Sequence, residues 1–318
     1  MDKKLKDGVV GAHSRHTNLL QNDKRLVPVW VLVMIGLLVS AEVYIISTSQ
    51  ACNFWEKKCT PTVVDANDVE SALFHRYYTE LKSIGALPPP DIGKKHANLC
   101  NTANRLQAQY EYCLPISGRK DSPFCDAADR MNLLNTDSKS ICFASVLHML
   151  MVEVYEELQA TGNTPFLTFG SLLGAVRNQS IIHYTEDVDI GYVDKLKMVD
   201  KLSVALQKKG YHMFFKDIWR VCVAPTHPLA GHLYDPDHLT TESFGVPYVD
   251  LYMMMQIKGT DWNLLELEKL LPKDRVQLFS QVTVNGQVFD TFRDPKYFLT
   301  VAYGSDYMVP KSRQTRQL

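Results

Sequence analysis

The segment 166–191 constrains the fold of this chain more than any other part of the sequence. It contains the run FLTFGSLLGAVR and, a little later, the run EDVDIG. Gly170 and Ser171 open a predicted short helix, whose free backbone N–H groups and positive dipole end suit a phosphate. Asp187 and Asp189 fall on a predicted strand, where residues two apart face the same way and can hold a divalent cation. Together these features are typical of phosphoryl or nucleotidyl transfer, and they indicate an enzyme.

Asp250 is a third candidate ligand. It is the single acid in the apolar, β-rich run VPYVDLYMMM at 246–255. A charge in such a run is costly unless it meets a cation or another partner. Metal sites for phosphoryl transfer need further ligands beyond one pair, and a neighbouring strand is a natural source. The alternative is a carboxylate at a strand end that is hydrogen-bonded to a turn, but the presence of Asp187 and Asp189 favours the metal site.

An apolar run of bilayer length lies near the N-terminus. Residues 27–46 read VPVWVLVMIGLLVSAEVYII, with Glu42 as the only formal charge. Twenty helical residues rise about 30 Å, which matches the hydrocarbon core of a membrane. Lys and Arg residues precede the run, so we predict a cytosolic tail at 1–26, a signal anchor at 27–47 and a lumenal remainder. A cleaved signal peptide is the alternative, but the preceding segment and the apolar run are both long for one.

The part after the predicted anchor divides into three by composition. Residues 48–95 have the character of a stem, with an amphipathic helix at 68–84 and three consecutive prolines that form a stiff spacer. Residues 96–137 are rich in loops and cysteines, and we expect the compact domain at 138–318. Interleaved helices and strands in that domain favour an α+β fold. The predicted helices are 138–160, 194–209 and 295–303, and the predicted strands are 165–169, 188–193, 211–216, 219–224, 246–257 and 287–292.

The seven cysteines all follow the predicted anchor, at positions 52, 59, 100, 113, 125, 142 and 222. A lumenal compartment is oxidising, so we expect disulfide bonds. Cys52 and Cys59 could close a small loop, and the four middle cysteines could form two bridges, which leaves Cys222 as a buried thiol. Zinc bound by the four middle cysteines is the alternative, although none of them has the usual paired-ligand spacing.

Gly170-Ser171, Asp187-x-Asp189 and the isolated Asp250 form a pattern that resembles the polymerase-β-like nucleotidyltransferase superfamily. The LicD/fukutin family within it is more similar still. Its segments read roughly FLxxGTLLGAxR, then IPWDDDIDIG, and its C-terminal YG.DWM.P resembles YGSDYMVP at 303–310. The resemblance implies a nucleotidyltransferase fold with a mixed sheet.

The family also implies a reaction, which is the transfer of a phosphorylated small group from a CDP-linked donor to a hydroxyl of a glycan or glycoprotein. The group is of the phosphocholine or phosphoalditol type. Because the domain is predicted to follow a type II anchor, we expect the reaction in the Golgi or ER. Asp187 and Asp189 would hold Mg²⁺ or Mn²⁺, and Asp250 would complete a second metal site or take the hydroxyl proton. The Gly170-Ser171 N–H groups would bind the donor phosphate. The nearly balanced charge, 34 Lys and Arg against 35 Asp and Glu, gives no reason to expect nucleic acid as a partner.

Some basic residues near these motifs have two interpretations. Arg177 could neutralise a donor oxygen, or it could be a surface arginine at the C-terminus of its helix. Lys216 and Arg220 border the site region as substrate contacts or as solvated charges on adjacent strands. Where the family favours Pro-Trp-Asp-Asp, this chain has HYTE at 183–186, so Thr185 replaces an acid. Because the metal-binding pair itself is intact, this difference concerns substrate preference more than activity.

Two other functions compete with this one. A nucleotide-sugar glycosyltransferase also combines a type II anchor with Asp-x-Asp and Mn²⁺, but it requires a nucleotide-binding βαβ unit before that motif. A non-catalytic relative could keep the fold and bind glycans or a partner enzyme, because a fold does not guarantee chemistry.

Overall fold

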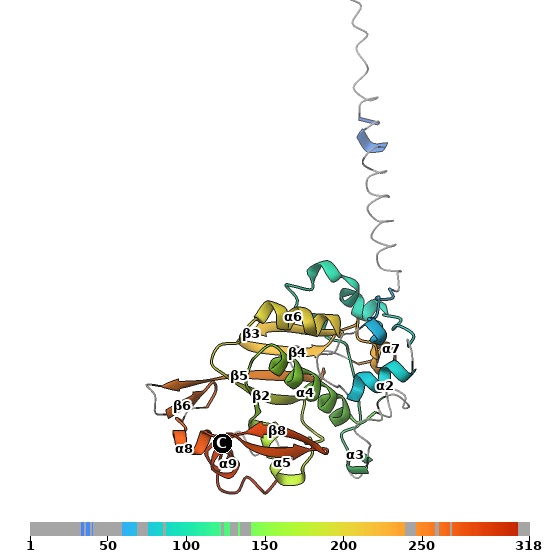
Figure 1. Cartoon of the computed structure of the whole chain (residues 1–318). Coiled ribbons are helices and arrows are strands. Elements are labelled where there is room, and N and C mark those ends of the chain that lie inside the picture. Colours follow the sequence, from blue (N-terminus) through green and yellow to red (C-terminus); the bar gives the residue numbers. More distant parts are fainter. Residues whose placement is uncertain are drawn as a thin grey trace, which may run out of the picture. The chain divides into compact units, whose positions relative to one another are not determined.

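The computed structural model describes most of the chain from Cys59 to Pro310, together with residues 33–34, 36–38 and 40 (Figure 1). Within this range, the described part does not include residues 69–75, 85–86, 122–123, 128–132, 134–140, 239–245, 258–260 and 268. The chain divides into two compact units, Met1–Glu56 and Lys57–Leu318, and the second carries all the structure discussed below. The predicted tail and most of the predicted anchor lie outside the described residues. None of the helices in the described part is long and apolar enough to span a bilayer.

A mixed sheet forms the centre of the second unit. Eight strands are present in the described part of the chain, in the order β3-β4-β5-β2-β1-β8-β7, with β6 paired to β5. The strands β2 and β5 are parallel, as are β1 and β8, and the other pairs are antiparallel. This arrangement agrees with the predicted α+β class. The strands are β1 Pro165–Leu167, β2 Asp187–Val193, β3 Tyr211–Lys216, β4 Ile218–Val223, β5 Tyr248–Ile257, β6 Asp261–Leu264, β7 Ser280–Val284 and β8 Gln287–Thr291.

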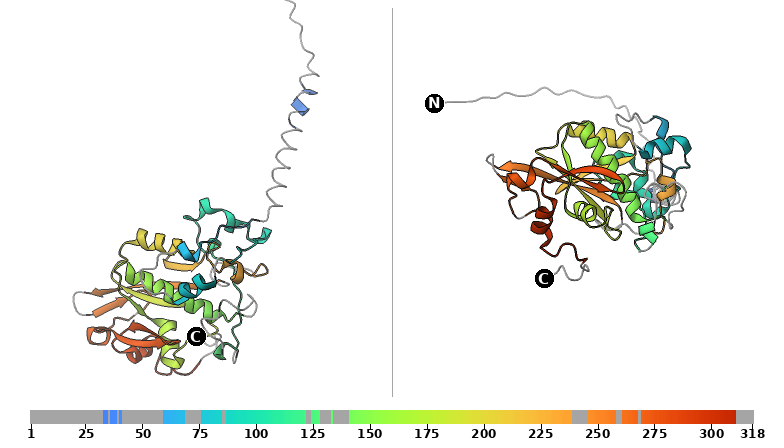
Figure 2. Two further views of the ribbon diagram at one scale, coloured as in Figure 1. Left: turned by 45° about the vertical axis from the view of Figure 1, so that its right-hand side comes forward. Right: turned by 60° about the horizontal axis from the view of Figure 1, so that its bottom comes forward.

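Helices cover both faces of the sheet. The long helix α4 and the helix α6 lie on one face, and α5 and α9 lie on the other (Figure 2). The sequence of α4 is apolar around most of its circumference, so the helix is buried along nearly its whole length. The α-helices are α2 Arg76–Ile84, α3 Phe124–Ala127, α4 Phe143–Ala160, α5 Phe169–Asn178, α6 Val199–Lys208, α7 Ala230–Leu233, α8 Lys273–Val276 and α9 Pro295–Tyr303. Short 3₁₀ turns lie at Ala66–Asp68, Lys94–Cys100, Thr102–Asn104 and Tyr110–Tyr112.

The predicted boundaries at 95 and 138 do not mark the edge of the compact unit. Ile92 and Leu114 are fully buried in the same hydrophobic core as α4. The backbone N–H of Leu114 also donates a hydrogen bond to the carbonyl of Val223 on β4. The proline run packs closely as well, because a Cβ on Gly231 of α7 would lie 2.0 Å from the Pro88 carbonyl oxygen. From Cys59 onward, the residues predicted as a stem and a loop-rich segment are therefore part of the globular unit.

Disulfide bonds join distant parts of this unit. The bonded pairs are Cys59–Cys100, Cys113–Cys222 and Cys125–Cys142. The expectation of disulfides is confirmed, and Cys125–Cys142 joins two of the four middle cysteines as expected, but the other expected pairs were wrong. Cys59 does not pair with Cys52, which lies outside the described residues, and Cys222 is not a free thiol. Zinc is also excluded at the four middle cysteines, because none of them keeps a thiolate. These pairings depend on which distant segments fold together, and sequence spacing does not show this.

Candidate active site

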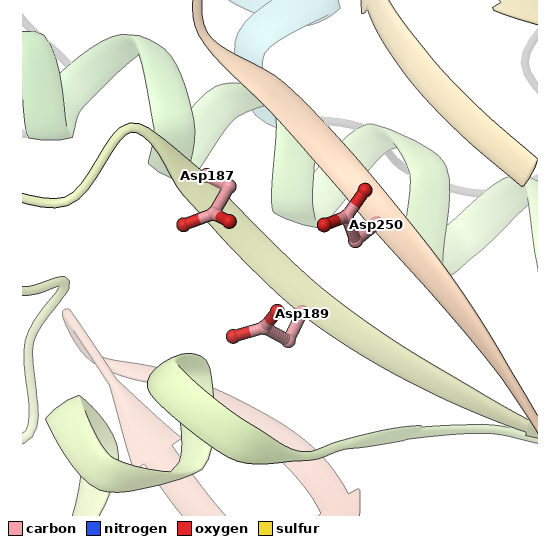
Figure 3. A group of neighbouring side chains, drawn as sticks. All are labelled: Asp187, Asp189 and Asp250. Carbon is pink, nitrogen blue, oxygen red and sulfur yellow. The ribbon is translucent and has the colours of Figure 1, made fainter. Parts of the chain in front are cut away.

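The structure brings Asp187, Asp189 and Asp250 together (Figure 3). In the parallel pair of β2 and β5, Asp189 lies beside Asp250. Side chains alternate along a strand, so the two acids of β2 point to one face while Val188 between them is buried on the other. One carboxylate oxygen from each of the three residues lies within 4.8 Å of the others. This spacing allows a single cation to contact all three side chains.

The start of α5 holds Asp189 in place. The Gly170 N–H donates to Asp189 Oδ2 at 2.7 Å, and the Asp189 N–H donates to Ser171 Oγ at 2.7 Å. A Cβ at position 170 would lie 2.9 Å from the same Oδ2, so the close contact depends on glycine. The predicted role of Gly170 and Ser171 as free phosphate donors thus changes, because the Gly170 N–H already binds a carboxylate of the site.

Arg177 contacts the C-terminal segment instead of the carboxylates. Its guanidinium donates to the carbonyl oxygens of Tyr307 and Val309. These residues belong to the motif at 303–310, and Tyr307 is buried. The described contacts of Arg177 therefore favour a structural role, in which it joins the end of α5 to this motif, over the predicted contact with a donor phosphate.

The electrostatics of the group favour a bound cation. Burial raises the pKa of Asp189 well above its usual value, and the neighbouring Asp187 and Asp250 raise it further. Burial also raises the pKa of Asp250 to about 7, even though Arg220 acts in the opposite direction. Two buried carboxylates that lie beside a third acid, as Asp189 and Asp250 do, resist ionisation unless positive charge compensates them. Apart from the guanidinium of Arg220, Asp250 Oδ1 has no polar partner among the described residues. This donor set therefore fits a hard divalent cation such as Mg²⁺ or Mn²⁺.

Arg220 is a site residue that sequence reasoning left undecided. It lies on β4 directly opposite Asp250 on β5, and its Nε is 2.7 Å from Asp250 Oδ1. The Tyr252 hydroxyl donates to the other oxygen of Asp250 at 3.3 Å. Only the pairing of β4 with β5 reveals the contact of Arg220, and no local motif around this residue indicates it.

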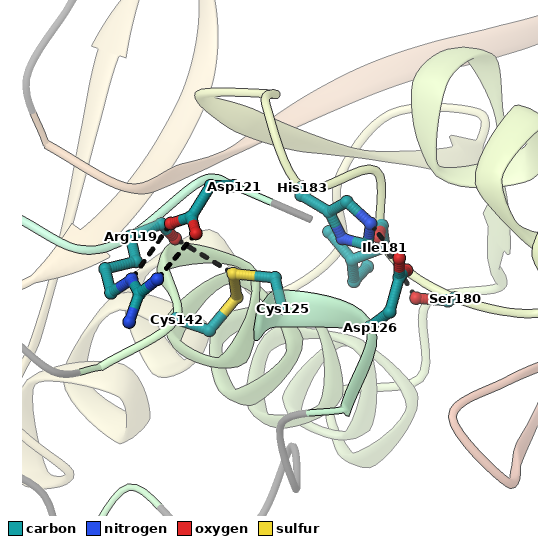
Figure 4. The surroundings of a disulfide bond; sticks show 8 residues. All are labelled: Arg119, Asp121, Cys125, Asp126, Cys142, Ser180, Ile181 and His183. Carbon is teal, nitrogen blue, oxygen red and sulfur yellow. Dashed lines mark hydrogen bonds and ion pairs between the residues drawn. A yellow bond between two sulfur atoms is a disulfide. The ribbon is translucent and has the colours of Figure 1, made fainter. Parts of the chain in front are cut away.

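The loop before β2 is held by residues of the cysteine-rich segment. The Thr185 hydroxyl donates to Asp187 Oδ1 at 2.8 Å, so the residue that replaces a family acid orients a carboxylate of the site. Glu186 forms an ion pair with Lys120 at 2.7 Å. His183 Nε2 lies 2.8 Å from Asp126, next to the Cys125–Cys142 disulfide (Figure 4). The segment predicted to lie outside the catalytic domain thus supports its site.

Residues 162–269 match the family model described as LicD/FKTN/FKRP, nucleotidyltransferase domain. The chain carries a LicD/FKTN/FKRP domain. The three carboxylates, Gly170-Ser171 and Arg220 all lie within the matched residues, and the eight-stranded sheet of the described part fits a nucleotidyltransferase-like domain. The family supports a transferase of the phosphotransferase kind. A search of curated proteins found no match to this chain.

Proposed function

We propose that this protein is a metal-dependent phosphotransferase. It transfers a phosphorylated small group, of the phosphoalditol or phosphocholine type, from a CDP-linked donor to a hydroxyl of a glycan or glycoprotein. The observation that carries the proposal is the group of three carboxylates, within 4.8 Å of one another, inside a LicD/FKTN/FKRP domain. The donor and acceptor classes come from the family resemblance of the sequence motifs.

In this proposal Asp187, Asp189 and Asp250 hold Mg²⁺ or Mn²⁺. When bound, the cation neutralises phosphate oxygens and the charge that develops on them. The protein contributes preorganised ligands, because the N-terminus of α5 fixes Asp189 and Thr185 orients Asp187. Alternatively, Asp187 and Asp189 hold the cation, and Asp250 beside them accepts the proton of the attacking hydroxyl.

The proposed location is the Golgi or ER membrane, with a single type II anchor and the domain in the lumen. The apolar run at 27–46 and the three disulfides of the described residues support this location. Structural disulfides form and persist mainly in oxidising compartments.

Nucleotide binding by the full-length chain tests the donor class. Thermal unfolding would be followed with CDP, UDP or GDP, each with and without Mn²⁺. The proposal predicts a rise in melting temperature with CDP plus Mn²⁺, because a ligand that binds only the folded state stabilises it. A preference for UDP or GDP would favour a nucleotide-sugar glycosyltransferase. The absence of any shift would favour a non-catalytic relative.

Substitution of the carboxylates tests the chemistry. Asp187→Asn or Asp189→Asn should lower the metal-dependent transfer rate about a hundredfold or more, because a metal ion contributes several kcal/mol to such a reaction. Asp200→Asn is the matched control, since Asp200 is an exposed acid in the first turn of α6. Full activity in both site variants would exclude the proposed role.

A further inference from the structure

Arg220 is a largely buried cation that contacts the carboxylate group and has no role in the proposal so far. The side chains of Arg220 and Asp250 are only 15% and 7% exposed. Their closest atoms, Nε and Oδ1, are 2.7 Å apart. The contact is therefore a close ion pair, and neither of the two atoms has a further polar partner among the described residues.

The backbone fixes the position of Arg220. The strands β4 and β5 are antiparallel, and Arg220 and Asp250 are direct cross-strand neighbours, so their side chains share a face of the sheet. The other end of the guanidinium is held separately, because Nη1 donates to the carbonyl of Lys216. The Tyr110 ring lies alongside, with its centroid 5.9 Å from the guanidinium carbon. The arginine is thus confined to the edge of the site whether or not it contacts Asp250.

A divalent cation and Arg220 compete for Asp250. Arg220 approaches one carboxylate oxygen, Oδ1, while Tyr252 occupies the other. A cation held by the three carboxylates would repel the guanidinium and take over the charge that the guanidinium now neutralises. A displaced guanidinium in a buried place needs a new anionic partner. A phosphate bound next to the cation supplies one, because the planar guanidinium matches phosphate oxygens in a bidentate geometry.

We infer that Arg220 neutralises Asp250 in the metal-free protein and binds the diphosphate of the nucleotide donor once a divalent cation holds the carboxylates. This inference rests on the proposed function. It makes Arg220 a donor-binding residue, and it predicts opposite effects of one substitution on metal binding and on nucleotide binding.

The test uses the full-length chain with Arg220→Gln, Arg220→Lys and the unchanged protein. Binding of Mn²⁺ alone, and of CDP and inorganic pyrophosphate in the presence of Mn²⁺, would be measured. Arg220→Gln should bind Mn²⁺ alone several-fold more tightly, since a competitor is removed. It should bind CDP and pyrophosphate roughly tenfold or more weakly, since a charge-assisted contact to phosphate is lost. For CDP and pyrophosphate, the affinity of Arg220→Lys should lie between the affinities of the unchanged protein and of Arg220→Gln.

Arg275→Gln is the matched control, because Arg275 forms an exposed ion pair with Asp294 outside the site, and it should change neither affinity. If Arg220→Gln weakens Mn²⁺ and CDP binding by the same factor, Arg220 only positions Asp250 and the inference is wrong. Unchanged CDP affinity would overturn it as well. If Arg220→Gln does not fold, the same affinities are measured for Arg220→Lys. This variant should bind pyrophosphate more weakly than the unchanged protein does. Failure of the unchanged protein to bind CDP with Mn²⁺ would instead contradict the proposed function itself.

Discussion

At the scale of single residues, Asp189 shows how the site is built. Its Oδ2 accepts the Gly170 N–H, and its own N–H donates to the Ser171 hydroxyl. A strand carboxylate and a helix N-terminus therefore hold each other, and the helix dipole favours the negative charge. The two halves of the motif at 166–191 therefore form one hydrogen-bonded structure.

Thr185 contributes to the same structure through Asp187. Thr185→Val keeps the shape of the side chain but removes the hydroxyl that donates to Asp187 Oδ1. We predict that the affinity for Mn²⁺ falls roughly fivefold, since one hydrogen bond to a ligand contributes about 1 kcal/mol. Thr185→Ser restores the hydroxyl and should restore the affinity. Equal Mn²⁺ affinities in all three proteins would show that the hydrogen bond does not orient the ligand.

The affinity for metal should depend on pH. Burial raises the pKa of Asp250 to about 7, so below that pH the carboxyl is protonated and must release its proton to bind a cation. We predict that Mn²⁺ affinity rises up to about tenfold per pH unit below pH 7 and changes less above it. Titrations between pH 5.5 and 8 check this. A profile that is flat through pH 7 would contradict it.

The same shift has a consequence for the metal-free protein. Its Asp250 binds a proton more tightly when folded than when unfolded, where the pKa is near 3.9. The contribution of this group to stability is therefore present at low pH and is lost as the pH rises from about 4 to 7. Chemical unfolding should show that Asp250→Asn lacks this pH-dependent part. If the variant and the unchanged protein lose stability in parallel over that range, Asp250 is not its source.

At the scale of elements, periodicity predicted most of the elements around the site. The helix predicted at 295–303 matches α9, and the acidic strand predicted at 188–193 matches β2 within one residue. The predicted helix at 194–209 begins only at Val199, because Asp194 and Met198 adopt positive φ values that form a turn. The strands β6 and β7 were missed, since they are short and β7 is mostly polar.

The contacts that sequence analysis did not predict depend on pairing between segments that are distant in the sequence. The three acids could be predicted because each stands in a recognisable local pattern. The contact between Arg220 and Asp250 depends on the register of β4 against β5. This register could not be predicted from a single sequence. The disulfide partners were unpredictable for the same reason.

The disulfides differ in the loops that they close, and this gives a prediction on stability. Cys113–Cys222 spans 109 residues, and Cys125–Cys142 spans 17. In the chain-entropy account, the longer loop stabilises by about 5 kcal/mol and the shorter by about 3 kcal/mol. Replacing both cysteines of each pair with serine should therefore destabilise the protein more for Cys113–Cys222. Denaturant unfolding of the two double variants compares them, and an equal or reversed order would contradict the prediction.

At the scale of the whole molecule, the parts that looked peripheral in the sequence belong to the globular unit. Composition suggested a stem because prolines and loops are frequent in linkers. Residues such as Ile92 and Leu114 nevertheless enter the core, and Lys120 and Asp126 support the loop before β2. Burial of irregular segments leaves no periodic signal, so only the folded structure shows it.

In the proposed function, Asp187, Asp189 and Asp250 form one divalent cation site. The most direct measurement is a Mn²⁺ titration of the full-length chain, followed by electron paramagnetic resonance, beside Asp189→Asn, Asp250→Asn and the control Asp200→Asn. We predict saturable Mn²⁺ binding that is retained in Asp200→Asn and weakened at least about tenfold in each of the other variants. Mn²⁺ binding that is absent from the unchanged protein, or that survives equally in all variants, would contradict it.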